Sequence, residues 1–166
     1  MSNLRIPVGL CDITYDGKTY SNLGSEALFE TNKKYKKMNH GQQQIKYMLE
    51  EYVVSLTLSL SEENYETLKL ADQSLKDYSG GLYDNPSKID YDGKELIIHP
   101  VESGNDKTYD IVIFKAIVDP ENPYTRTFSK GADIVNVRFL GQPSKQIAGN
   151  TFKSYYFIGD PVKAGV

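Results

Sequence analysis

The alternation of apolar and polar side chains constrains the fold of this 166-residue chain more than any other feature. Every even-numbered residue from Val54 to Leu60 is apolar, and every odd-numbered one is a serine or a threonine. Successive side chains of a β-strand point to opposite faces, so this pattern predicts a strand with one face in a core. The other face is expected to be neutral and polar.

Other stretches add strands to this one. Residues 111–118 are apolar on both faces except at Lys115, which predicts a central strand covered on both sides. Residues 135–140 alternate again, and residues 152–158 are rich in aromatic, strand-forming side chains. The sequence therefore predicts a sheet of several short strands.

Two dipeptides predict tight hairpin turns. Asp16-Gly17 and Asp92-Gly93 each lie between strand-forming segments. Both residue types tolerate the positive φ angles of a type I′ turn, so a β-hairpin is expected at each place.

One segment, from Ser61 to Tyr78, predicts a helix. Ser61 can cap its start, and two glutamates in the first turn suit the helix dipole. An apolar stripe with spacings of three and four follows. Its members are Tyr65, Leu68, Ala71, Leu75 and Tyr78. The expected fold is mainly β, a β-sandwich or barrel with one flanking α-helix, in a single domain over residues 1–166.

Composition and motifs argue against several functions. The net charge is −3, whereas general nucleic-acid binders are normally basic. No apolar run approaches the roughly 20 residues of a membrane helix. The chain has neither phosphate-binding glycine loops nor a serine-nucleophile elbow, and His40 and His99 lack metal-ligand spacing. We therefore expect no enzymatic activity, no metal and no cofactor.

A basic stretch stands out in the polar region at about 25–44, which is expected to form a long protruding loop or hairpin. Its members are Lys33, Lys34, Tyr35, Lys36, Lys37, Met38, Asn39, His40 and Gly41. It could be a lysine-guarded sheet edge, since lysine discourages strand-to-strand aggregation. It could instead be a docking arm for an acidic neighbouring subunit, or a patch that contacts phosphates.

The order of these features resembles that of the major tail (tail tube) proteins of long-tailed bacteriophages. The shared features are a short strand with an Asp-Gly turn, a long polar hairpin, an alternating strand, a helix and further strands. Two short segments belong to the same pattern: Phe128-x-Lys130-Gly131 before residues 135–140, and Phe157-Ile158-Gly159-Asp160 near the end.

The resemblance implies a structural virion protein that self-assembles into stacked hexameric rings, forming the tail tube for DNA delivery. Lys33 to Gly41 would be the ring-stacking loop, and the helix residues Tyr65, Leu68, Leu75 and Tyr78 would lie near the subunit boundary. Partners would be other copies of the chain, tape-measure and tail-end proteins, and DNA that passes without specific binding. The protein would be made in the host cytoplasm and reside in the virion tail.

A conduit for DNA should not bind phosphates tightly, because each lysine or arginine contact adds salt-dependent affinity. The neutral face of Ser55, Thr57 and Ser59 is therefore the candidate lumen face. Three alternatives remain open: a terminator ring, a secretion-tube subunit, and a monomeric β-sandwich binding module.

Overall fold

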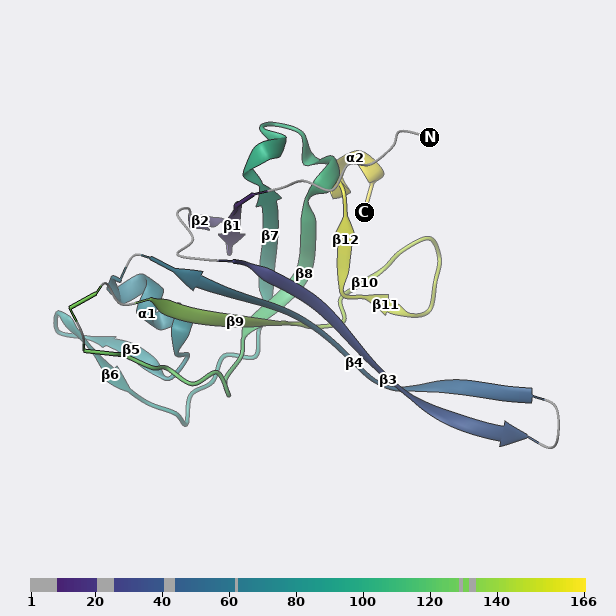
Figure 1. The fold of residues 1–166 in the computed structure, drawn as a ribbon, viewed down its shortest axis with the longest axis horizontal. Helices are drawn as coiled ribbons and strands as arrows, with labels where there is room; N and C mark the ends of the chain where they lie inside the picture. The colour runs from purple at the N-terminus through teal and green to yellow at the C-terminus, as the bar shows by residue number, and fades with distance from the viewer. Residues whose placement is uncertain (1–8, 21–25, 41–43, 62, 129, 132–133) are drawn as a thin grey trace.

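The computed structural model describes residues 9–20, 26–40, 44–61, 63–128, 130–131 and 134–166, and antiparallel strands dominate it (Figure 1). The strands are β1 (Cys11–Tyr15), β2 (Lys18–Tyr20), β3 (Leu28–His40), β4 (Gln44–Leu60), β5 (Leu75–Tyr78), β6 (Gly81–Asp84), β7 (Lys94–Pro100), β8 (Ile111–Val118), β9 (Val135–Gly141), β10 (Lys145–Gln146), β11 (Lys153–Ser154) and β12 (Tyr156–Ile158). The helices are α1 (Tyr65–Ala71) and α2 (Pro161–Ala164), and the 3-10 turns are η1 (Val101–Ser103) and η2 (Lys107–Tyr109).

The main sheet has the strand order β2-β1-β7-β8-β9-β4-β3, and β12 also pairs with β8. Residues 111–113 of β8 pair with β12, and residues 116–118 pair with β9. Two strands thus pair with the same side of β8: β12 runs alongside it, whereas β9 turns away toward α1 (Figure 1). The edge strands of this path are β2 and β3.

The sheet curls around its core. The rings of Tyr15 on β1 and Phe139 on β9 lie 4.8 Å apart, although β7 and β8 separate these strands in the sheet order. The even-numbered side chains of the alternating strand are at most 3% exposed, and Leu70 and Ala71 of α1 join them in the core. The expected class, mainly β with a flanking helix, is confirmed.

The helix is shorter than its apolar stripe predicts. It starts after Asn64, not Ser61, because Asn64 and Thr67 form a reciprocal capping box with two 2.9 Å hydrogen bonds. It ends at Asp72, whose carboxylate accepts a hydrogen bond from the backbone N–H of Ser74. Local side-chain bonds of this kind compete with helix continuation.

The prediction that Leu75 and Tyr78 lie on the helix is therefore wrong. Both residues belong to β5, which pairs with β6. The turn between these strands has positive φ at Ser79 and Gly80, so the glycine pair expected to end a helix closes a hairpin.

The two Asp-Gly turns have different outcomes. Asp16 and Gly17 both have positive φ and join β1 to β2, as a type I′ turn requires. No strand precedes Asp92-Gly93, so the second predicted hairpin is wrong. Instead, the Asp90 carboxylate accepts a hydrogen bond from the backbone N–H of Asp92, and the strand β7 starts only at Lys94.

Within the described ranges, none of the helices has the combined length and apolar composition that crossing a membrane requires.

Candidate assembly interface

A two-stranded arm projects from the body of the molecule (Figure 1). We define the arm as residues 31–40 of β3 and 44–54 of β4. β4 pairs with β9 only from Ser55 to Leu60, so within the described chain the arm strands pair only with each other. The outermost segment of β3, from Tyr35 to His40, extends about 20 Å at the usual rise of a strand.

Aromatic side chains anchor the base of the arm. The Tyr52 ring lies 4.9 Å from that of Tyr155 and 6.5 Å from that of Phe152. Phe29 packs edge-on against Tyr156 at 5.1 Å. Burial, followed by the neighbouring Tyr156, raises the pKa of Tyr52 to about 12. The arm therefore leaves the body from a packed base, whose aromatic residues the sequence marked only as strand-forming.

A β-bulge lies midway along the arm. Lys34 pairs with Glu51, but the next residue, Tyr35, pairs with Leu49. Glu50 is thus the extra residue on β4. A bulge bends a strand and increases its twist, so it changes the direction of the outer half of the arm relative to the body.

Both faces of the outer arm carry exposed apolar side chains. Tyr35, Tyr47 and Leu49 share one face, where the two tyrosine rings meet edge-on at 6.4 Å. Met38 and Met48 lie on the other face. These five side chains are between 37% and 66% exposed. An isolated two-stranded hairpin is marginally stable in water, and exposed apolar surface of this kind is typical of interaction sites.

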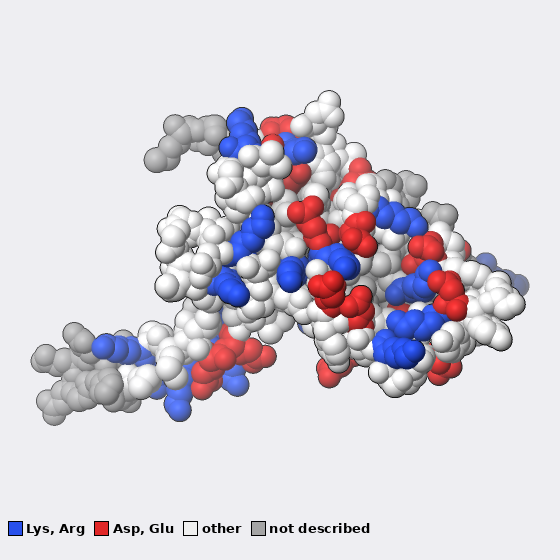
Figure 2. Space-filling model, turned by 180° about the vertical axis from the view of Figure 1, so that it is seen from behind, with Lys and Arg blue, Asp and Glu red and all other residues white. Residues whose placement is uncertain are grey.

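The arm is basic at its outer end. Residues 33–48 contain five lysines and no carboxylate, so the rest of a chain with net charge −3 carries −8. Glu30, Glu50 and Glu51 lie nearer the base. Figure 2 shows carboxylates grouped where the arm leaves the body and lysines along the arm. The arm and the body thus have opposite net charge.

The predicted stacking loop falls on this arm. Lys33 to His40 all lie on β3, and Gly41 is outside the described residues. The lysines also lie on a sheet edge, because β3 is the last strand of the main sheet. The geometry is compatible with both the edge and the docking interpretation.

The candidate lumen face needs a correction at Ser55. Ser55 is fully buried, so it contributes nothing to a polar surface of the described chain, whereas Thr57 and Ser59 are half-buried. The alternation predicted which face of the strand Ser55 lies on, but not that this side chain is covered. Its burial depends on packing against other segments of the chain, which the alternation of one strand does not reveal.

The same face holds two residues that sequence reasoning missed. Asn136 and Arg138 on β9 pair directly with Ser59 and Thr57. The Ser59 hydroxyl donates a 2.8 Å hydrogen bond to Asn136, and Arg138 forms a 3.3 Å ion pair with the buried Asp119. The alternation of β9 predicts that Asn136 and Arg138 share one face, but it does not predict that β9 pairs with β4.

The remaining predicted site residues lie around α1. Tyr65 is 52% exposed, and its hydroxyl donates to the Gly80 carbonyl; Leu68 packs against the core. Leu75 is half-buried on β5, and Tyr78 is 74% exposed beside Tyr83. α1, β5 and β6 thus form one lobe with exposed tyrosines.

Across the part of the chain that the structure describes, no group of three histidine, cysteine or acidic side chains is placed to hold a metal ion.

Comparison with known proteins identifies the fold but not a family. No protein-family model matches the sequence, and no curated protein matches it. Among solved structures, the chain resembles the tube-terminating cap of the anti-feeding prophage, with a TM-score of 0.51 and 10% identity over 84% of this chain and 91% of that one. It also resembles the sheath/tube terminator of the extracellular contractile injection system PVC in its extended state, with a TM-score of 0.51 and 9% identity over 84% of this chain and 94% of that one.

A third similar structure comes from the PVC sheath–tube complex in its extended state, with a TM-score of 0.53 and 11% identity over 84% of this chain and 88% of that one. The three structures belong to phage-tail-like injection particles, and none is described as an enzyme. At these identities, the likeness establishes a shared fold.

Proposed function

We propose that this protein is a structural subunit of a phage tail or tail-like injection particle, and that copies of it close into rings that stack as a tube. The observation that carries this proposal is the arm. Its outer strands have no partner but each other in the described chain, and it exposes apolar side chains on both faces. A second copy of the chain could cover both features.

The open sheet edge supports the same conclusion. Unpaired strand edges promote uncontrolled association, and proteins normally cover or guard them. A head-to-tail contact that repeats around a closed ring removes the problem for every subunit at once. The shared fold with tube and terminator components of injection particles supports this assembly.

The finer features of the proposal follow the phage-tail resemblance. The ring is a homohexamer, the lumen passes DNA without specific binding, and tape-measure and tail-end proteins are its other partners. On the candidate lumen face, the ion pair between Arg138 and Asp119 neutralises the one arginine beside Thr57. A neutral lumen releases phosphates readily.

A terminator is the second candidate. Two of the similar structures are described as a tube-terminating cap and a sheath/tube terminator. A terminator forms one ring at the end of a tube, so its arm would contact a different protein instead of its own copies.

Negative-stain electron microscopy of the concentrated protein, combined with sedimentation velocity, tests the proposal. Stacked rings with a hollow centre are expected for a tube subunit, and single rings indicate a terminator. A monodisperse monomer at every concentration would contradict both and favour a monomeric binding module.

A further inference from the structure

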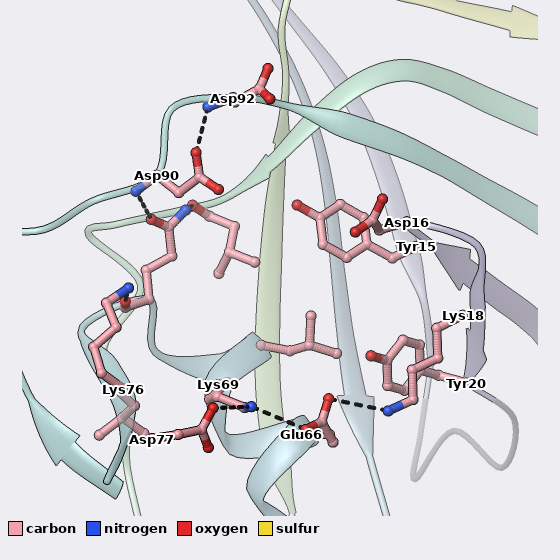
Figure 3. A pocket seen from close by; sticks show the side chains of 14 residues that line it. Tyr15, Asp16, Lys18, Tyr20, Glu66, Lys69, Lys76, Asp77, Asp90 and Asp92 are labelled. Atoms are coloured by element: carbon pink, nitrogen blue, oxygen red, sulfur yellow. Dashed lines mark hydrogen bonds and ion pairs between the residues drawn. The ribbon is translucent and has the colours of Figure 1, made fainter.

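A pocket of about 430 Å³ opens on the body between the β1–β2 hairpin, α1, β5 and the loop before β7 (Figure 3). α1 and β5 lie at the opposite end of the molecule's long axis from the arm tip (Figure 1). A surface at each end is the arrangement that a head-to-tail contact between copies requires.

One wall of the pocket is a chain of ion pairs. Lys18 lies 3.2 Å from Glu66, which lies 3.0 Å from Lys69, and Lys69 lies 2.9 Å from Asp77. Figure 3 shows these four side chains along the lower side of the pocket. Two lysines and two carboxylates leave this wall with no net charge.

The opposite side of the pocket is acidic. Asp92 is paired with Lys94 at 2.9 Å, but Asp16 and Asp90 form no ion pair with any described residue. All ionisable lining residues together give the pocket a charge of −2. Burial, reinforced by Asp90 and Asp16, raises the pKa of the Tyr15 hydroxyl to about 12. Asp16 and Asp90 thus place negative charge on this side of the pocket.

Aromatic rings and carboxylates together favour an ammonium group. Tyr15 and Tyr20 both line the pocket, and the Lys18 ammonium already lies 5.6 Å from the centre of the Tyr20 ring. A cation over a ring face and near carboxylates gains from both interactions. A lysine also has an apolar stem, which suits the Leu70 and Leu75 side chains in the same lining.

We propose that this pocket receives lysine side chains from the arm of a second copy. Residues 33–48 contain five lysines and no carboxylate, and the rest of the chain has a net negative charge. Lys36 and Lys46 lie on the same arm face, beside Met38 and Met48, and are the lysines we assign to the pocket. This inference rests on the proposed self-assembly.

A double-mutant cycle tests the contact. The pocket variant is Asp16→Asn with Asp90→Asn, and the arm variant is Lys36→Gln with Lys46→Gln. Asparagine tolerates the positive φ of residue 16 and can still accept the hydrogen bond from the backbone N–H of Asp92. The matched control, Asp84→Asn with Glu121→Gln, removes two exposed carboxylates outside the pocket.

The concentration at which half the protein assembles, measured by sedimentation, is the readout. Each variant should raise it about tenfold, and the combined variant should raise it little further, because both remove the same contact. Added salt should weaken assembly of the wild type more than of either variant. The control should assemble like the wild type.

Two results would overturn the inference while leaving the proposed function standing: wild-type assembly by the pocket variant, or strictly additive effects in the combined variant. A wild-type protein that never assembles would instead refute the proposed function, and the inference with it. Circular dichroism of each variant verifies that it folds.

Discussion

Ser55 and Ser59 are alike in sequence context, yet the structure gives them different roles. Ser55 is fully buried, and its hydroxyl oxygen has no hydrogen-bond partner within the described residues. Ser59 is half-buried and donates to Asn136. A buried hydroxyl without a partner costs stability, whereas a bonded one contributes to it.

Ser55→Ala is therefore expected to raise the free energy of unfolding by about 1 kcal/mol, because it removes an unsatisfied buried group. Ser59→Ala, the matched control, should lower it by about 0.5–1 kcal/mol. Urea denaturation of the two variants under non-assembling conditions measures both. Equal destabilisation by the two substitutions would show that Ser55 has a partner after all.

His99 couples the end of β7 to the start of β8. Its Nδ1 lies 2.5 Å from the Asp110 carboxylate, and its Nε2 lies 2.8 Å from the Gly104 carbonyl oxygen. Both partners are acceptors, so both ring nitrogens donate only in the protonated imidazole. Burial alone would lower the pKa of His99, but the hydrogen bonds to Asp110 and Gly104 outweigh it and raise the pKa.

A raised pKa in the folded state means that protonated His99 stabilises the fold. This contribution is complete below the unfolded pKa of about 6.5 and is lost as the pH rises through the folded value. The melting temperature of the wild type should thus fall relative to that of His99→Gln as the pH rises above about 6.5. Parallel pH profiles of the two proteins would contradict this assignment.

Among the elements, the strands were the most predictable from sequence. Burial sets the pattern in each of these strands. One buried face produces the alternation of β4 and β9, and two buried faces produce the continuous apolar run of β8. The helix boundaries were less predictable. The apolar stripe extends through Leu75 and Tyr78 because residues of a short hairpin can match helical spacing. The helix starts instead at the Asn64 capping box, which the apolar stripe does not indicate.

The candidate site was only partly predictable. The lysine-rich composition of β3 indicated an exposed segment, but it left open a guarded edge, a docking arm and a phosphate-contacting patch. The Glu50 bulge and the aromatic base around Tyr52 depend on strand register and on contacts with residues 152–156, which local patterns do not contain. The residues that line the pocket come from four separate segments, so no single sequence motif predicts it.

The arm is expected to be dispensable for folding and necessary for assembly. Replacing residues 36–48 by Asn-Gly joins Tyr35 to Leu49 through a two-residue turn and leaves the aromatic base intact. The variant should unfold like the wild-type monomer, because the removed side chains described by the structure are exposed. Its assembly concentration should rise by more than about tenfold in sedimentation experiments.

Tubes formed by this variant at the wild-type concentration would show that the outer arm makes no essential contact. A variant carrying the conservative substitutions Met38→Leu and Met48→Leu is the control, since it keeps the apolar surface of the arm and should assemble normally.

At the scale of the whole molecule, two surfaces remain incomplete in a single described chain. One is the outer edge of β3 together with the apolar faces of the arm, and the other is the acidic pocket beside α1. They lie at opposite ends and differ in charge, so the proposed contact would join the arm of one copy to the pocket of the next. This complementarity gives a physical reason for repeated head-to-tail assembly of a chain with this fold.

Cryo-electron microscopy of the assembled protein, at a resolution that traces each strand, is the most direct measurement. The account predicts closed rings in which every arm lies against a neighbouring subunit with its apolar side chains covered. Rings whose arms extend freely into solvent would contradict it, as would a protein that stays a single chain with the arm folded back onto its own body.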